Sequence, residues 1–171
     1  MYRLFVDLDG VLVDFESGVK RVTGRLPHEQ TQRSMWSQLA RTDGFYEHLD
    51  WTRDGRELWE ALKEHEPTIL TGLPLGRWAE PQKRAWCARE LGPGVPVITC
   101  MSRNKAKRAR EVTPPDATPV LVDDREWLRD RWEEMGGVFV HHTDAASSIE
   151  RVNAIMRRGS ARPPTGFRRR S

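Results

Sequence analysis

Short apolar runs recur along the chain, each bounded by turn residues. They cover Leu4–Leu8, Thr68–Thr71, Val95–Cys100, Val120–Asp123 and Val138–His141. Runs of this length that are rich in valine, isoleucine and leucine are typical of buried strands. The pattern therefore predicts a set of short strands distributed over most of the chain.

The stretches between these runs carry helix start and stop signals. Glu80–Leu91 has Pro81 in its first turn and is followed by Gly92, while Arg125–Met135 is followed by a pair of glycines. Proline near the start and glycine just past the end are the usual boundaries of a helix. Strands that alternate with helices predict an α/β fold, a Rossmann-like doubly wound parallel sheet with helices on both faces.

Residues 16–58 interrupt this alternation. They hold Trp36, Phe45, Tyr46 and Trp51 among polar residues, and the segment is too long for a simple connection between strands. We interpret it as a mostly helical cap inserted after the first strand. Because ligands of open α/β sheets bind beyond the carboxyl ends of the strands, such a cap would cover the site.

Composition sets the domain count and the expected order of the chain. The 171 residues, 37% of them hydrophobic, predict a single domain over residues 1–156. Residues 157–171 contain six arginines and no acid, so the formal net charge of +3 becomes −3 without them. We expect this segment to be a flexible tail that makes at most a weak contact with nucleic acid.

Other sequence features indicate the cellular location of the protein and the state of its cysteines. Residues near Met1 do not form a charged and then apolar leader, and the chain has no apolar run long enough to span a membrane. Cys87 and Cys100 do not form a CxxC pair, so neither a disulfide framework nor a structural zinc site is indicated. We expect a cytoplasmic protein with no membrane association and two free thiols.

Chemically reactive side chains follow four of the predicted strands. These are Asp7 and Asp9 after the first, Thr71 and Gly72 after the second, Ser102, Arg103, Asn104 and Lys105 after the third, and Asp123 and Asp124 after the fourth. The carboxyl ends of parallel strands lie at one edge of the sheet, so these groups are expected to meet there. Four carboxylates in one place require a divalent cation, and the cationic and hydroxyl groups beside them suit a phosphate.

The first pair of acids has two interpretations. Side chains two positions apart on an extended strand point to the same face, so Asp7 and Asp9 would converge on one spot. Asp9-Gly10 is also an ordinary turn sequence that could simply end the strand. The recurrence of acids and cations at the other strand ends favours the functional interpretation.

Taken together, these motifs resemble the haloacid dehalogenase-like superfamily, most of whose members are magnesium-dependent phosphohydrolases. The resemblance covers about residues 3–125 and consists of DxDGV, then Thr-Gly, then a lysine, then a hydrophobic residue before V-DD. The stretches DLDGVLVDFE, KRAW, LGP, SRNK and LVDDR are most similar to the 5′(3′)-deoxyribonucleotidases.

This resemblance implies a role for each acid of the first motif. Asp7 would be the nucleophile that forms an aspartyl-phosphate, and Asp9 would be the general acid and base. Dehalogenases lack the second acid, and the ion-pumping ATPases have threonine there, so Asp9 favours a phosphohydrolase. Magnesium would be held by Asp7, the main-chain carbonyl of Asp9, and either Asp123 or Asp124.

The resemblance also implies a phosphate-binding set. Thr71 and the backbone N–H of Gly72 would hold phosphoryl oxygens, although a threonine beside a glycine is also a common turn cap. Lys105 is the favoured active-site lysine because it comes earliest after its strand, with Arg103 as a second phosphate contact. Lys107 and Lys83 remain alternatives, and Lys83 matches a basic position of the nucleotidases.

Substrate preference would be decided in the cap. Phe15 matches a base-contacting aromatic of the deoxyribonucleotidases and Trp36 matches a cap tryptophan, although both are equally compatible with packing inside the cap. Met35 departs from an expected aromatic, which leaves base and sugar preference open. We expect a nucleoside monophosphate as substrate. Alternatives are a nucleic-acid 3′-phosphate or sugar phosphate, or a non-catalytic nucleic-acid-binding module; a homodimer is also compatible with the sequence.

Overall fold

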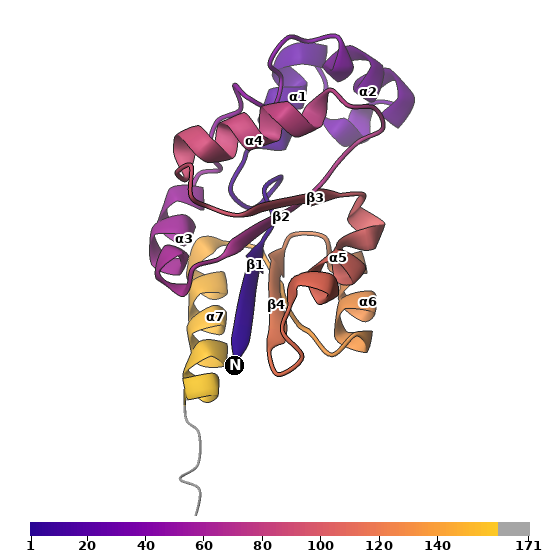
Figure 1. The fold of residues 1–171 in the computed structure, drawn as a ribbon. Coiled ribbons are helices and arrows are strands. Elements are labelled where there is room, and N and C mark those ends of the chain that lie inside the picture. Colours follow the sequence, from indigo (N-terminus) through magenta and orange to yellow (C-terminus); the bar gives the residue numbers. More distant parts are fainter. Residues whose placement is uncertain (161–171) are drawn as a thin grey trace, which may run out of the picture.

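A five-stranded parallel sheet forms the centre of the structure, a computed structural model that describes residues 1–160 (Figure 1). Its strands are β1 (Tyr2–Val6), β2 (Thr68–Gly72), β3 (Val97–Cys100), β4 (Thr118–Asp123) and β5 (Val138–His141). They lie in the order β3-β2-β1-β4-β5, and every pair is parallel. β2 and β3 therefore lie on one side of β1, and β4 and β5 lie on the other. The carboxyl ends of β1 and β4 are adjacent at the point where the strand order reverses.

Two hydrophobic clusters cover the two faces of this sheet, and the alternation of side chains along each strand decides which face a residue joins. Leu4 and Val6 of β1 belong to one cluster, whereas Phe5 between them belongs to the other. Helices α3 (Gly55–Leu62), α4 (Ala79–Glu90) and α7 (Ala145–Ser160) contribute to the first cluster, and α5 (Lys105–Val112) and α6 (Arg129–Glu134) to the second. The predicted doubly wound α/β fold is confirmed.

Element boundaries differ from the prediction by a few residues, for local reasons. β1 ends at Val6, and Asp7 is the first residue beyond it, although its N–H still donates to Val122 O at 3.0 Å. β3 begins at Val97 because Pro96 has no N–H to give to the ladder. The helix expected from Arg125 begins as a 3-10 turn, Glu126–Leu128, and becomes α-helical at Arg129. Further 3-10 turns are Pro27–Glu29, Lys63–His65 and Ser102–Asn104.

Helices α1 (Phe15–Thr23) and α2 (Gln32–Ala40) lie beyond the end of the sheet, between β1 and α3 in the chain (Figure 1). Asp14 caps the start of α1, with its carboxylate accepting from Ser17 N, and Gly24 caps its end in the left-handed conformation. The insertion expected over about 16–58 also takes in the start of α3. That helix packs against α7 beside the sheet, so α1 and α2 with the turns up to Trp51 are the part that stands over the strand ends.

The C-terminal segment differs from the expectation in its first residues. Residues 157–160, expected to belong to a flexible tail, continue α7. Val152 and Ile155 of this helix are buried, and the backbone at Gly159 lies against the Tyr2 ring, so packing carries the helix past the predicted boundary. The rest of the expected tail, residues 161–171, lies outside the described residues.

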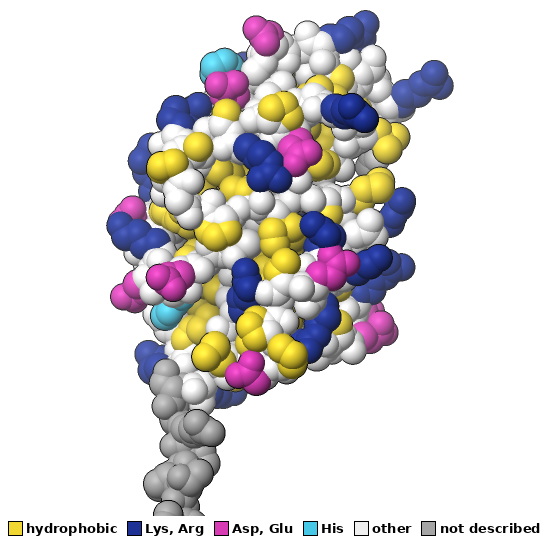
Figure 2. Space-filling model, viewed as in Figure 1, with side chains coloured by type: hydrophobic (Ala, Val, Ile, Leu, Met, Phe, Trp, Pro, Cys, Tyr) yellow, Lys and Arg dark blue, Asp and Glu magenta, His cyan; other side chains and the backbone are white. Residues whose placement is uncertain are grey.

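The surface carries both signs of charge. On the face shown in Figure 2, Lys and Arg side chains are interspersed with Asp and Glu, the mixed pattern of an ordinary protein surface. Within residues 1–160 no helix combines the length and the apolar character needed to cross a membrane. Cys87 and Cys100 are both free.

Candidate active site

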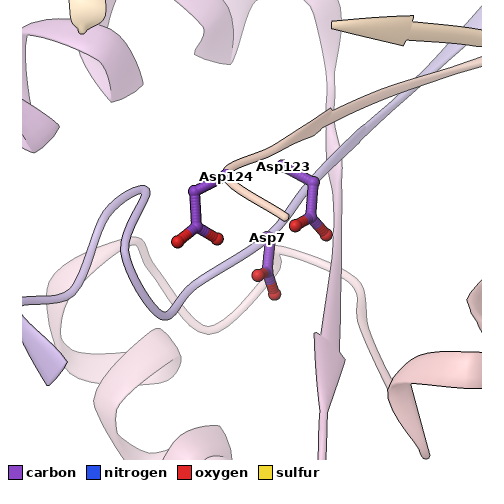
Figure 3. A group of neighbouring side chains, drawn as sticks. All are labelled: Asp7, Asp123 and Asp124. Atoms are coloured by element: carbon purple, nitrogen blue, oxygen red, sulfur yellow. The ribbon is translucent and has the colours of Figure 1, made fainter. Parts of the chain in front are cut away.

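Three carboxylates converge at the carboxyl ends of β1 and β4. Asp7 follows β1 directly, Asp123 is the last residue of β4, and Asp124 comes next. One oxygen from each lies within 4.8 Å of the others, and Figure 3 shows the three carboxyl groups close together. β1 and β4 are neighbours in the sheet, which is why residues more than a hundred positions apart meet here.

Lys105 closes the buried side of this cluster. Its ammonium group lies 2.9 Å from Asp7 Oδ1 and 2.6 Å from Asp123 Oδ2, and its side chain is only 2% exposed. Burial by itself lowers the pKa of Lys105, but the two carboxylates more than offset this and hold the pKa above its ordinary value. Lys105 is therefore a permanently charged partner of the acids.

Asp9 does not share the position of Asp7, contrary to the expectation from a straight strand. The strand has already ended, and the chain turns back over residues 8–13, with the N–H groups of Val11, Leu12 and Val13 donating to Leu8 O. The turn directs Asp9 Oδ2 to Lys83 Nζ at 2.8 Å, while Asp9 Oδ1 is buried and has no hydrogen-bond partner among the described residues. The two acids therefore lie in the same cavity with different cationic partners.

Lys83 connects the first two motifs. From α4 it donates to Asp9 Oδ2, to Thr71 Oγ1 at 3.0 Å and to the Gly72 carbonyl at 2.7 Å. Its side chain is 1% exposed, and its ammonium group lies 4.3 Å from the centre of the Tyr46 ring. The structure thus brings both Lys83 and Lys105 to the acids.

The other basic residues predicted for the site are exposed and lie outside the buried cluster of acids. Lys107 is exposed on α5, away from the acids, which removes it as a candidate. Arg103 is also exposed, but it lines the mouth of the cavity described below.

Two glycines make room for this arrangement. Gly10 has φ +77°, and a Cβ there would lie 2.3 Å from Asp124 Oδ2, so a side chain would collide with the carboxylate cluster. At Gly72 a Cβ would lie 2.2 Å from Ser102 Oγ. The DxDG motif therefore needs glycine both for space and for the left-handed backbone at Gly10, whereas Gly72, the last residue of β2, leaves space for Ser102.

Arg125 was not among the site residues predicted from the sequence. Its N–H donates to Asp123 Oδ1 at 2.9 Å, and its guanidinium donates to Ser102 Oγ at 3.2 Å. Burial lowers the pKa of Arg125, but Asp7 and Asp9 outweigh that effect and raise it. Its place directly after the second pair of acids, in LVDDR, was the available signal.

The acids after β4 bind protons unusually well in the metal-free protein. Burial, followed by the charge of Asp7, raises the pKa of Asp123 to about 6, although Lys105 opposes the shift. Burial with the charges of Asp7 and Asp123 raises the pKa of Asp124 to about 7. A divalent cation would relieve the same repulsion by replacing these protons.

The oxygens of this cluster fit such an ion. Both oxygens of Asp123 already have donors, Lys105 and the Arg125 N–H, whereas Asp124 Oδ1 is buried without a hydrogen-bond partner among residues 1–160. Oxygen atoms in this arrangement are the ligands that magnesium prefers. Asp124, together with Asp7 beside it, is thus better placed to bind the ion than Asp123.

A cavity of about 810 Å³ opens above Asp7 and Asp9, between α2 and the loops that follow the strands. Trp36 of α2, Tyr46 and Trp78 line one part of its wall, with Tyr46 and Trp78 stacked at 5.5 Å between ring centres. The backbone of Tyr46 is held by Gln82 of α4, which accepts its N–H at 2.8 Å. Tyr46 and Trp78 were not predicted as site residues, because only the fold brings them to Trp36.

Phe15 has a different place from the one expected for a base-contacting residue. It is half-buried behind the cavity wall, with its ring 5.7 Å from that of Trp36 and 6.0 Å from that of Tyr46. It does not line the cavity. In this structure Phe15 supports the aromatic wall, and Trp36 is the predicted aromatic that faces the cavity.

Comparison with known proteins identifies the fold. No protein-family model and no curated protein matches the chain. Among solved structures, a hydrolase from Streptococcus pneumoniae TIGR4 matches 89% of this chain and 98% of its own, with a TM-score of 0.56 and 10% identity. A haloacid dehalogenase-like family hydrolase from Streptococcus pneumoniae matches 91% and 98%, with a TM-score of 0.55 and 12% identity. The chain shares the α/β fold of these hydrolases.

Proposed function

We propose that the protein is a magnesium-dependent phosphomonoester hydrolase of the haloacid dehalogenase-like type, acting through an aspartyl-phosphate on Asp7. The observation that carries this proposal is the pairing of two acids in one cavity with two buried lysines. Asp7 lies against Lys105, and Asp9 lies against Lys83. A nucleophile and a separate proton-transfer group are what a two-step phosphoryl transfer needs.

In the first step an oxygen of Asp7 attacks phosphorus and the bond to the leaving oxygen breaks, while Asp9 gives that oxygen its proton. In the second step a water attacks the aspartyl-phosphate, Asp9 takes a proton from the water, and inorganic phosphate leaves. Asp9 suits both steps because only Oδ2 is engaged by Lys83 and Oδ1 has no hydrogen-bond partner among residues 1–160. One carboxyl group thereby gives a proton to the leaving group and regains one from the attacking water.

The phosphoryl oxygens would be received by groups already in place. Thr71 Oγ1 accepts from Lys83, so its own O–H proton remains available to donate. The Gly72 N–H, Lys105, Lys83 and the Arg125 guanidinium add further donors or positive charge around the same point. Magnesium bound by Asp7, Asp124 and the Asp9 main-chain carbonyl would offset charge on the phosphate and orient it.

A nucleoside monophosphate is the substrate class that we propose. The wall formed by Trp36, Tyr46 and Trp78 lies in the same cavity as Asp7, where the leaving group would sit. Flat aromatic faces suit a base better than they suit a bare sugar. A non-catalytic nucleic-acid module is disfavoured, because a protein that only binds phosphates gains nothing from acids at this point.

A phosphate-release screen tests the proposal. Purified protein with Mg²⁺ would be offered ribo- and deoxyribonucleoside monophosphates, sugar phosphates and 3′-phosphorylated oligonucleotides, with Asp7→Asn protein as the control. We expect the monophosphates to be hydrolysed, and acid-quenched enzyme to carry phosphate on Asp7 only in the unmutated protein. Release from none of these substrates would refute the phosphohydrolase, and preference for sugar phosphates would refute the nucleotidase.

A further inference from the structure

Exposed apolar side chains gather at the mouth of the active-site cavity. Four large hydrophobic residues are exposed within residues 1–160, and three of them, Leu75, Met101 and Trp127, line this cavity. Leu75 follows β2, Met101 follows β3 and Trp127 follows β4, with 57% of Trp127 exposed. The loops at three strand ends therefore each present an apolar side chain at the same opening, which points to a ligand that extends past the catalytic floor.

Two arginines at the same mouth have no acidic partner. Arg33 on α2 and Arg103 after β3 both line the cavity and are exposed, and neither makes an ion pair in the part of the chain that the structure describes. Six other arginines of the described residues are paired, for example Arg84 with Glu80 and Arg129 with Glu126. Unpaired guanidinium groups in the lining of an opening suit an anion, and these two are separate from Arg125, whose backbone N–H donates to Asp123 and whose guanidinium donates to Ser102.

We propose that the cavity accepts the phosphorylated end of a short single-stranded oligonucleotide, so that a second nucleotide occupies the mouth. This rests on the proposed function, because the terminal phosphate would be the one removed at Asp7. The first nucleoside lies against Trp36 and Tyr46. The phosphodiester that follows is contacted by Arg33 and Arg103, and the next base stacks on Trp127.

The combination of groups favours this ligand over others. Basic side chains that follow a backbone, interleaved with aromatic rings that stack on bases, are the usual recognition chemistry of single-stranded nucleic acid. A sugar phosphate or a single nucleotide would leave Trp127 and the outer arginines without a contact. Because α2 stands over the cavity, we expect the end of a single nucleic-acid strand to enter it and a duplex to be kept out.

Binding provides a test that does not depend on turnover. Asp7→Asn protein with Mg²⁺ would be titrated with a nucleoside monophosphate, with 5′- and 3′-phosphorylated dinucleotides of the same first base, and with the dinucleotide lacking a terminal phosphate. Tryptophan fluorescence or calorimetry gives the affinities. We expect a phosphorylated dinucleotide to bind about tenfold or more tightly than the mononucleotide, and the 5′ and 3′ arms identify which end is preferred.

Variants at the mouth of the cavity show which side chains produce the preference for dinucleotide. Trp127→Ala and Arg33→Gln should each remove most of the preference for dinucleotide over mononucleotide, and Arg33→Gln should also lower the slope of log affinity against log salt by about 0.7. Arg151→Gln is the matched control. Arg151 is exposed on α7 and does not line the cavity. It should leave both affinities unchanged.

Two results would overturn the inference. One is equal affinity of the Asp7→Asn protein for mononucleotide and dinucleotides. The other is a dinucleotide preference that survives both mouth variants. Either result leaves the proposed hydrolase intact if the unmutated enzyme releases phosphate from mononucleotides, whereas absence of release from every phosphomonoester refutes the hydrolase without touching the binding result.

Discussion

Lys83→Met tests whether the buried lysine of α4 holds the active site together. The substitution keeps most of the side-chain volume but removes the ammonium group that donates to Asp9, Thr71 and the Gly72 carbonyl. Removing one partner of a buried ion pair typically costs about 3–5 kcal/mol. Water reaches the Asp9 side chain, which is 15% exposed, so we take the lower end, about 3 kcal/mol.

The assay is equilibrium unfolding in urea and by heat, in metal-free buffer, followed by tryptophan fluorescence. For a chain of this size about 3 kcal/mol corresponds to a fall in Tm of about 6–12 °C. Lys107→Met is the matched control, because Lys107 is exposed on α5, the next helix in the chain, and should change Tm little.

The double variant Lys83→Met with Asp9→Asn separates the ion pair from simple packing. Once Asp9 is neutral, loss of Lys83 no longer leaves a carboxylate without its cation, so the double variant should be more stable than the sum of the single effects by about 1–3 kcal/mol. Strict additivity, or a Tm for Lys83→Met within the range of the Lys107→Met control, would refute this account of the site.

Further predictions concern the chemistry, the metal, the aromatic wall and the end of the chain. Asp7→Asn should fold normally by circular dichroism and lose turnover; retention of about a tenth of the rate would exclude Asp7 as the nucleophile, since an amide cannot replace the attacking carboxylate. Burial and two neighbouring carboxylates raise the pKa of Asp124 to about 7, above its unfolded value, so the metal-free protein should lose stability as pH rises through 7. The Tm gained from Mg²⁺ should therefore be larger at pH 8 than at pH 5.5, and a gain independent of pH would contradict the assigned ligand. Trp36→Ala should lower kcat/KM for a nucleoside monophosphate by about ten- to a hundredfold and that for a small aryl phosphate much less, whereas Phe15→Ala should mainly lower Tm; the reverse pattern would exchange their roles. Deleting residues 161–171 should leave hydrolysis of mononucleotides nearly unchanged, and a large loss would mean that these residues reach the site.

Much of the fold follows from local sequence pattern. Short apolar runs bounded by turn residues, and helices bounded by proline and glycine, indicated a parallel α/β sheet, and no strand end differs from its expected position by more than two residues. Boundaries such as the end of β1 at Val6 differ because strand ends depend on pairing with a neighbour, which a single run of residues does not reveal.

Only part of the candidate site could be predicted from local sequence pattern. That Asp7, Asp123 and Lys105 would approach one another followed from their places after strands of one parallel sheet, since all such ends share an edge. The direction of Asp9 did not follow, because it depends on the turn over residues 8–13. Nor did the wall formed by Tyr46 and Trp78, which come from segments with no common motif.

The sequence by itself determined the order of strands and helices along the chain and the chemical types at the strand ends. Tertiary structure alone decided which cation serves which acid. Lys83 and Asp9 are 74 positions apart and meet only when α4 packs on the sheet beneath α1 and α2. Sequence pattern reflects interactions between near neighbours in the chain. A buried ion pair depends instead on how helices and strands far apart in the chain are positioned by packing of the core.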